Sequence, residues 1–91
     1  GLVLVVAAVQ STTGKLVSGP DIVSRGFVYV RESEHLIDGA REQVKDLFTR
    51  LEAEHVRDWS SVKTRIRETV SSYLYRRTKR SPMILPILME V

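Results

Sequence analysis

The sequence predicts a small α+β domain in which two helices pack on one face of a sheet of three to four strands. Two features indicate this class: apolar, β-branched runs occur near both ends of the chain, and two amphipathic stretches of helical period lie between them. Of the 91 residues, 43% are hydrophobic and 27% are charged, which is the balance of one folded domain and not of a disordered tail. The expected order of elements along the chain is β-β-β-α-α-β.

The first two strands are expected to form a hairpin. Residues 2–9 are an unbroken apolar run, which is typical of a strand with both faces covered. Turn residues at 11–14 then return the chain into a second strand at 15–17. Within this turn, Gly14 is expected to take a positive φ.

Proline and extended apolar patterns place the remaining strands. The segment Gly19-Pro20-Asp21 is expected to break the ladder, because proline has no N–H to donate. An extended pattern resumes at 26–30 and predicts the third strand. The terminal strand is expected at 83–91, where the internal Pro86 favours an edge position or a bulge over a central position.

Each predicted helix has a capping residue and one apolar stripe. Ser33 is the N-cap candidate of the first helix and Asp58 that of the second, which Ser81-Pro82 ends. The stripe of the first helix contains Leu36, Ile37, Ala40, Val44, Leu47, Phe48 and Leu51. The stripe of the second helix contains Trp59, Val62, Ile66, Val70, Tyr73, Leu74 and Arg77.

Two helices cover one face of a sheet, yet both faces of the first strand are apolar. Leu2, Leu4, Val6 and Ala8 share one face, and Val3, Val5, Ala7 and Val9 share the other. Because a contiguous apolar patch of several hundred Å² is unusual on a monomer, another copy of the chain or the rest of a parent chain is expected to cover the second face. The alternative is that the sheet and loops of this chain alone enclose the strand.

No catalytic, metal-binding or cofactor-binding site is predicted within these residues. The chain has no cysteine, and its two histidines, His35 and His55, lack the close spacing that metal ligands use. The glycines form no phosphate-binding pattern, and the serines form no nucleophile elbow. The absence of cysteine fits a reducing cytoplasm, and the longest apolar run, 2–9, is too short to span a membrane.

Positive charge concentrates towards the C-terminus. The formal net charge is +3, and residues 56–91 carry eight Lys and Arg against three Asp and Glu. The candidate RNA contacts are Arg76, Arg77, Lys79, Arg80 and Tyr75. In that interpretation the basic side chains bind phosphates while the tyrosine stacks on a base. The alternative, favoured because basic helix ends are common, is that these cations complement the helix dipole and that Tyr73 and Leu74 belong to the core.

Two long segments resemble the ribonuclease J family. Residues 19–33, GPDIVSRGFVYVRES, are similar to the opening of the C-terminal domain of that family, and residues 78–91, TKRSPMILPILMEV, are similar to its close. The two amphipathic stretches, with Asp58-Trp59 at the start of the second, fall between them in the family's order. The resemblance spans essentially all 91 residues, and the chain, which begins at Gly1, is expected to be a piece of a longer protein.

The resemblance implies a parent enzyme that is a bacterial or archaeal cytoplasmic ribonuclease. In that family, metallo-β-lactamase and β-CASP domains precede this one, bind two zinc ions and cleave RNA both from the 5′ end and internally. The family's H-x-H-x-D-H zinc motif matches no position of this sequence, so no catalytic residue is carried over. The family's C-terminal domain is a small sheet faced by two helices and is associated with dimer or tetramer formation.

Two functions are therefore compatible with these residues. The first is assembly: the domain docks through its exposed sheet face and holds copies of the catalytic domains together, with candidate interface residues Leu4, Val6, Phe27 and Ile87. The second is an accessory RNA-binding module that guides RNA to the distant active site through the basic segment. The expected partners are a second copy, the parent's catalytic domains and, for the second function, RNA.

Overall fold

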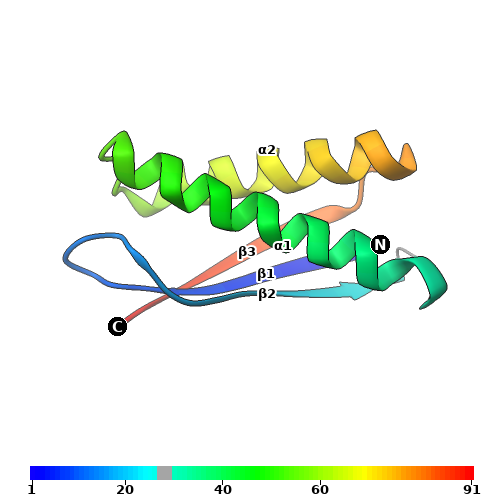
Figure 1. The fold of residues 1–91 in the computed structure, drawn as a ribbon, viewed down its shortest axis with the longest axis horizontal. Coiled ribbons are helices and arrows are strands. Elements are labelled where there is room, and N and C mark those ends of the chain that lie inside the picture. The colour runs from blue at the N-terminus through cyan, green and yellow to red at the C-terminus, as the bar shows by residue number, and fades with distance from the viewer. Residues whose placement is uncertain (27–29) are drawn as a thin grey trace.

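The structure of the chain, a computed structural model, describes residues 1–26 and 30–91, with side chains for residues 1–26 and 34–91. The elements in chain order are β1 (Leu2–Val9), β2 (Leu16–Arg25), α1 (Val30–Ala53), α2 (Trp59–Thr78) and β3 (Met83–Glu90). Both helices lie over the same face of a three-stranded sheet with the order β2-β1-β3 (Figure 1). The predicted α+β class, with two helices on one face, is confirmed.

β1 is the central strand, and this position explains its unbroken apolar sequence. It pairs antiparallel with β2 through the predicted hairpin, in which Gly14 has a φ of +75°. It pairs parallel with β3, which the chain reaches by crossing over the sheet through α1 and α2. Val3, Val5 and Val9 point towards the helices and have no exposed surface. The helices therefore complete a core on one side of β1 only.

β2 continues through Gly19-Pro20-Asp21, where the sequence pattern predicts a break. The ladder with β1 is irregular at this point, between Val6 and Ala8, so the predicted break is a bulge within one strand. At Gly19 the φ is +91°, and an added Cβ would lie 2.9 Å from the carbonyl oxygen of Val6, so both conditions require glycine. Because β2 is an edge strand, Pro20 has a neighbouring strand on one side only, and this makes the missing N–H tolerable.

The predicted third strand at 26–30 is wrong at its C-terminal end, because Val30 is the first residue of α1. Residues 27–29 of that prediction lie outside the described residues. Ser33 consequently lies inside the first turn of α1, and its predicted role as N-cap is wrong. A short apolar run does not distinguish a strand from the first turn of a helix, and this explains the error. The described order is β-β-α-α-β.

The apolar stripes predicted for the two helices form the core with the inner face of the sheet. The buried members are Leu36, Ala40, Val44, Leu47, Phe48 and Leu51 in α1, and Val62, Ile66, Val70, Tyr73 and Leu74 in α2. Ile37 and Trp59 are partly buried against this cluster. Arg77, the last predicted member, is instead exposed, and its guanidinium lies 5.2 Å from the centre of the Tyr73 ring.

Local hydrogen bonds set both ends of α2. Asp58 is the predicted N-cap, and its carboxylate accepts a hydrogen bond of 3.0 Å from the backbone N–H of Ser61. At the other end Lys79 takes a left-handed conformation, with φ 58°, and its backbone N–H donates to the carbonyl of Tyr75 at 2.8 Å. The helix therefore ends just before Ser81-Pro82, where the sequence predicts its end.

The two helices approach closely at Gly39. This glycine lies in the middle of α1, where glycine is unfavourable for helix formation. A Cβ at this position would overlap the hydroxyl of Tyr73 and lie 2.6 Å from the ring carbon that carries it. The missing side chain thus makes room for Tyr73 of α2, which is 6% exposed.

Candidate docking face and basic helix end

The sheet face that points away from the helices is apolar, and we call it the outer face. Its members follow from the register of the strands: Leu2, Leu4, Val6 and Ala8 in β1, Met83, Leu85, Ile87 and Met89 in β3, and Ser18, Asp21, Val23 and Arg25 in β2. Leu85 is 46% exposed and Met83 is 69% exposed, which are high values for large apolar side chains. No described element covers this face (Figure 1). It is a contiguous patch of the kind that marks an interaction surface.

Three of the four candidate interface residues lie on the outer face. They are Leu4, Val6 and Ile87, whereas Phe27 lies outside the described residues. The sequence interpretation missed Leu85 and Val23, which flank Leu4 in the same row of the sheet. Alternation around Pro86 is the signal that could have placed Leu85 beside Ile87 on one face.

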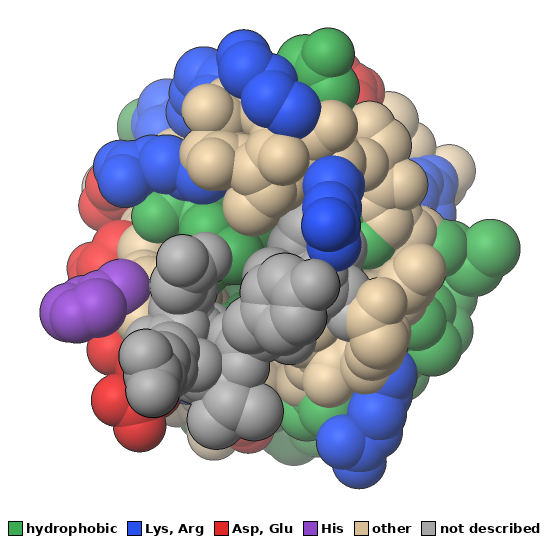
Figure 2. All heavy atoms as spheres, turned by 90° about the vertical axis from the view of Figure 1, so that its right-hand side faces the viewer, with side chains coloured by type: hydrophobic (Ala, Val, Ile, Leu, Met, Phe, Trp, Pro, Cys, Tyr) green, Lys and Arg blue, Asp and Glu red, His purple; other side chains and the backbone are tan. Residues whose placement is uncertain are grey.

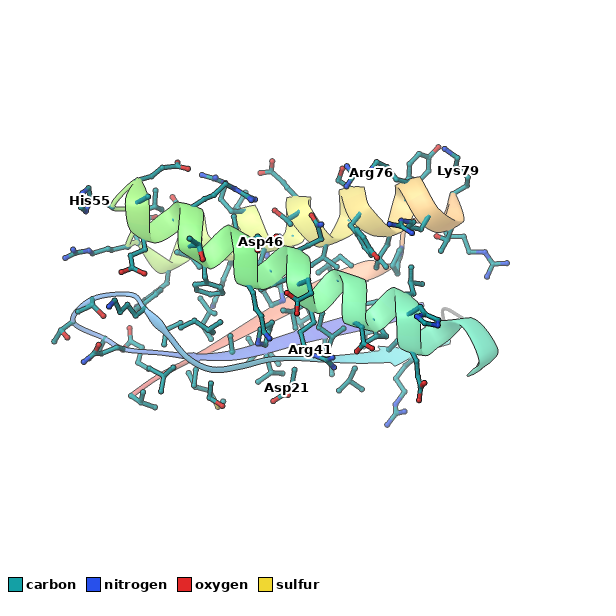
Figure 3. The ribbon with its side chains drawn as sticks, in the orientation of Figure 1. Asp21, Arg41, Asp46, His55, Arg76 and Lys79 are labelled. Atoms are coloured by element: carbon teal, nitrogen blue, oxygen red, sulfur yellow. The ribbon has the colours of Figure 1, made fainter. Side chains whose placement is uncertain are left out.

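The outer face is organised in rows across the three strands. Arg25, Leu2 and Met83 form the first row, Val23, Leu4 and Leu85 the second, Asp21, Val6 and Ile87 the third, and Ser18, Ala8 and Met89 the fourth. The two charged members, Asp21 and Arg25, both lie on β2, two residues on either side of Val23. Figure 3 shows Asp21 pointing away from the helices. Neither charge forms an ion pair within the described part of the chain.

Both edges of the sheet are poorly suited to accept an added strand. The backbone N–H of Met83, at the start of β3, donates to the carbonyl of Gly1, and that of Val91, just after β3, donates to the carbonyl of Val9. The residues of β3 that alternate with these, Pro86 among them, therefore direct their backbone groups to the free edge. Pro86 offers no donor there. At the β2 edge, the carbonyl of Pro20 accepts a hydrogen bond of 3.2 Å from Nε of Arg41 in α1. The face of the sheet is therefore a more favourable docking surface than its edges.

Most side chains of the basic end of α2 already have local contacts. Lys79 Nζ lies 5.3 Å from the centre of the Tyr75 ring, and Arg76 Nη1 lies 3.0 Å from Oγ of Ser72. Tyr73 and Leu74 are buried, as the alternative to an RNA site expects. Tyr75 is 49% exposed. Figure 2, which faces this end of the molecule, shows several Lys and Arg side chains along its upper part. The candidate RNA contacts thus share one end of the molecule, with Tyr75 partly covered by a lysine.

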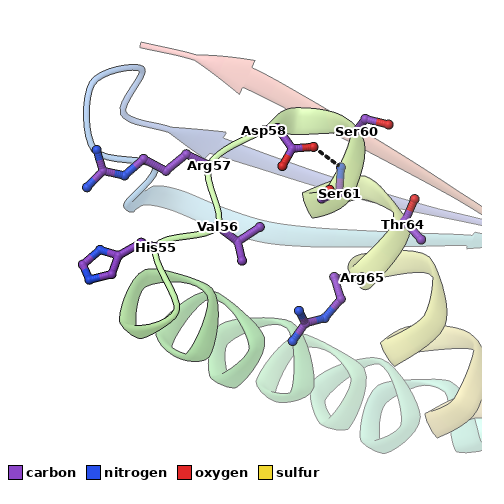
Figure 4. A pocket seen from close by; sticks show the side chains of 8 residues that line it. All are labelled: His55, Val56, Arg57, Asp58, Ser60, Ser61, Thr64 and Arg65. Atoms are coloured by element: carbon purple, nitrogen blue, oxygen red, sulfur yellow. Dashed lines mark hydrogen bonds between the residues drawn. The ribbon is translucent and has the colours of Figure 1, made fainter.

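Two open hollows lie on the helical layer and share Arg65. The first, of about 500 Å³, surrounds the turn between the helices and is lined by His55, Val56, Arg57, Asp58, Ser60, Ser61, Thr64 and Arg65 (Figure 4). The second, of about 430 Å³, is lined by Gln43, Arg50, Arg65, Glu68, Thr69, Ser72 and Arg76. Arg65 Nη1 lies 3.5 Å from a carboxylate oxygen of Glu54, so this cation is already paired. Both linings are polar and mixed in charge.

The pKa of Asp58, in the first hollow, is lowered from its ordinary value. The side chain of Ser61 hydrogen-bonds to the carboxylate and is the largest cause, and the backbone N–H of Ser61 adds to it. Hydrogen bonds to the charged form favour that form. The role of Asp58 as the N-cap of α2 is therefore sufficient to explain its lowered pKa, and no ligand is needed.

Neither histidine belongs to a cluster of possible metal ligands among the described residues. His35 and His55 are exposed, and His55 takes a left-handed conformation in the turn after α1. Among the residues that the structure describes, no three His, Cys, Asp or Glu side chains converge as a metal site requires. No described helix is long and apolar enough to cross a membrane.

The chain matches ribonuclease J proteins along its whole length. A family model described as the Ribonuclease J C-terminal domain matches residues 1–91. Ribonuclease J2 of Bacillus subtilis (strain 168) is 46% identical over 91 residues, which are 100% of this chain and 16% of the relative. Ribonuclease J 2 proteins of Staphylococcus saprophyticus and of Staphylococcus aureus (strain NCTC 8325) are 38% identical over the same length and the same shares.

The chain therefore corresponds to about one sixth of the length of these curated relatives. The match includes both segments that carry the resemblance, 19–33 and 78–91, and the two helices between them. It also agrees with the predicted family. This chain belongs to the family of ribonuclease J C-terminal domains.

Proposed function

We propose that this chain is the assembly domain of a ribonuclease J and that its outer face holds copies of the protein together. The observation that carries the proposal is the uncovered apolar face of a sheet whose other face already has its core. Leu85, Ile87 and Val23 remain between 39% and 46% exposed on that face. Removing such apolar surface from water is the dominant favourable term in most protein association.

The size of the face sets the expected strength of association. Three strands about 4.8 Å apart and four rows about 7 Å apart make a planar footprint on the order of 400 Å². Stable interfaces bury about 800 Å² per partner, so association through this face alone is expected to be weak and concentration-dependent. In the parent protein, contacts between the other domains add to it.

On this proposal the chemistry belongs to parts of the parent outside this chain. The relatives are named ribonucleases, which supports a parent that hydrolyses RNA. Cleavage from the 5′ end and internally, in the cytoplasm, is what the family resemblance implies and belongs to the proposal. As the family resemblance implies, we expect the zinc ions of the parent in its metallo-β-lactamase and β-CASP domains. The domain contributes to activity by fixing the arrangement of the catalytic domains.

A charge on the outer face tests the proposal. We expect sedimentation of the 91-residue chain to show a dimer that forms as the concentration rises, and Leu85→Glu to remain monomeric over the same range. The matched control is Ala53→Glu, which adds the same charge at an exposed position at the end of α1 and should associate as the unchanged chain does. Circular dichroism should show that both variants are folded. Association of Leu85→Glu equal to that of the unchanged chain rejects the proposal.

A second candidate function, RNA guidance, is favoured by the grouping of the cations at the end of α2. We expect it to act through phosphate contacts, so binding would weaken steeply with salt. The test replaces Arg76, Arg77, Lys79 and Arg80 by glutamine in the full parent enzyme and measures its RNA affinity at low salt. A loss of about tenfold or more supports this function. The control variant of the same enzyme replaces Lys15, Lys45, Lys63 and Arg67 by glutamine. Equal RNA affinities of the two variants contradict RNA guidance by the end of α2.

A further inference from the structure

We infer that two copies pack outer face to outer face with their strands reversed, so that Asp21 of each copy meets Arg25 of the other. This inference rests on the proposed assembly function and adds the orientation of the two copies and the residues that fix it. It follows from the register of the sheet and from the positions of two charges that have no ion-pair partner within the described chain.

A pair of identical faces packs most simply about a two-fold axis that lies in the plane between them. Such an axis runs either across the strands or along them. An axis across the strands places β2 over β2 of the other copy and reverses its direction. An axis along the strands instead places β2 over β3. The two arrangements bring different residues to the charged positions.

The axis across the strands pairs the charges when it passes through the row of Val23, Leu4 and Leu85. Asp21 lies two residues to one side of this row and Arg25 two residues to the other. Rotation by half a turn therefore places each Asp21 opposite the Arg25 of the other copy. Packed sheets lie about 10 Å apart, a gap that an arginine and an aspartate side chain span together.

Neighbouring axes across the strands bring like charges together. An axis through the row of Val6 places Asp21 over Asp21, and an axis through the row of Leu2 places Arg25 over Arg25. Like charges in direct opposition across an interface are strongly unfavourable. Of these three rows, only that of Leu4 brings opposite charges together.

The axis along the strands leaves both charges without partners. It places Asp21 opposite Ile87 and Arg25 opposite Met83, because those residues occupy the same rows on β3. Covering a charge with an apolar side chain removes its water and gives no hydrogen bond in return. The reversed arrangement gives each covered charge an opposite charge that offsets the loss of water, and it also sets Leu2 over Val6 and Leu85 over Leu85.

Exchanging the charges tests this arrangement. We expect Asp21→Arg and Arg25→Asp each to weaken self-association of the 91-residue chain by about tenfold or more. In each variant, positions 21 and 25 carry the same charge, so two copies bring like charges into opposition. The double variant D21R/R25D should recover association, because it restores the reciprocal pairs. Arg67→Asp, the same change of charge as Arg25→Asp but on an exposed residue of α2, should associate as the unchanged chain does.

Mixing the two single variants gives the sharpest readout. The Asp21→Arg chain carries arginine at both positions, and the Arg25→Asp chain carries aspartate at both. Opposite charges therefore meet only in a dimer of the two different variants. Both chains remain net positive, since the changes move the formal charge of +3 by two in either direction, and long-range attraction therefore does not explain their association. We expect sedimentation to show a mixed dimer where neither variant alone dimerises.

The outcomes separate this inference from the proposed function. If Leu85→Glu abolishes association while the charge variants associate normally, or if the mixed variants do not associate, the copies pack in another orientation and this inference is overturned. If Leu85→Glu and the charge variants all associate as the unchanged chain does, the assembly function is overturned as well. Circular dichroism of each variant verifies that a lost dimer is not a lost fold.

Discussion

The inner and outer faces of the sheet consist of alternate residues of the same strands, yet their surroundings are opposite. Val5 and Val6 are consecutive, of the same type and central in β1, but Val5 has no exposed surface while Val6 is half-buried. Local sequence is therefore not what distinguishes the two faces. The helices pack on one face only, so β1 serves the fold with one side and, on our proposal, assembly with the other.

The strongest test of this contrast places the same lysine on either side of β1. Val5→Lys should unfold the chain, because burial of an unpaired ammonium costs several kcal/mol, comparable with the total stability of a small domain of about 5–15 kcal/mol. Val6→Lys should remain folded and lose self-association, since its side chain reaches solvent beside Asp21. Thermal unfolding followed by circular dichroism measures both. Equal melting temperatures for the two variants would mean that the faces are not different.

Truncation in β3 gives a graded form of the same contrast. Ile84 points inward and is 7% exposed, whereas Leu85 points outward and is 46% exposed. Ile84→Ala should lower the free energy of unfolding by about 2–4 kcal/mol, and Leu85→Ala by less than about 1 kcal/mol when the chain is monomeric. Urea unfolding at low protein concentration gives both values. A larger loss for Leu85→Ala would show that the outer face is covered within one chain.

The sequence predicts the inner face well because its apolar residues recur with the period of a helix in α1 and α2 and with the period of a strand in β1. The stripes of α1 and α2 are buried nearly as expected, and the capping role of Asp58 is correct. The two apolar faces of β1 also follow from alternation. These features depend on residues close in the sequence, so local patterns are sufficient to find them.

The sequence does not predict the outer face as a set of rows. The pairing of Leu85 with Leu4 depends on β3 lying parallel to β1, which is a contact between distant parts of the chain. The positions of Asp21 and Arg25 on either side of Val23 depend on β2 continuing past Gly19-Pro20-Asp21, where the local signal predicts a break. Register is a property of the folded sheet and has to be observed there.

The tightness of packing is a further difference between the two faces. Gly39→Ala should lower the free energy of unfolding by about 1–3 kcal/mol, because the added methyl group overlaps Tyr73 and this outweighs the better helix propensity of alanine. Val23→Ile adds one carbon on the outer face and should change the stability of the monomer by less than about 0.5 kcal/mol. Urea unfolding compares them. In a Tyr73→Leu background the cost of Gly39→Ala should shrink, and an unchanged cost would exclude Tyr73 as its cause.

Asp58 belongs to neither face of the sheet and caps α2. Asp58→Ala removes the hydrogen bond to Ser61, and we expect the melting temperature at pH 7 to fall by about 5 °C.

The contribution of Asp58 to stability depends on pH. The folded state lowers the pKa of this carboxyl below its ordinary value of 3.8. Its contribution is therefore complete above that value and is lost as the pH falls through the lower, folded pKa. The difference in melting temperature between the unchanged chain and Asp58→Ala should therefore be constant from pH 7 to pH 5 and shrink below pH 4. Asp58→Asn keeps an uncharged cap and should show no such change relative to Asp58→Ala. A difference that grows on acidification would contradict the sign of the shift and the role of the carboxylate in capping α2.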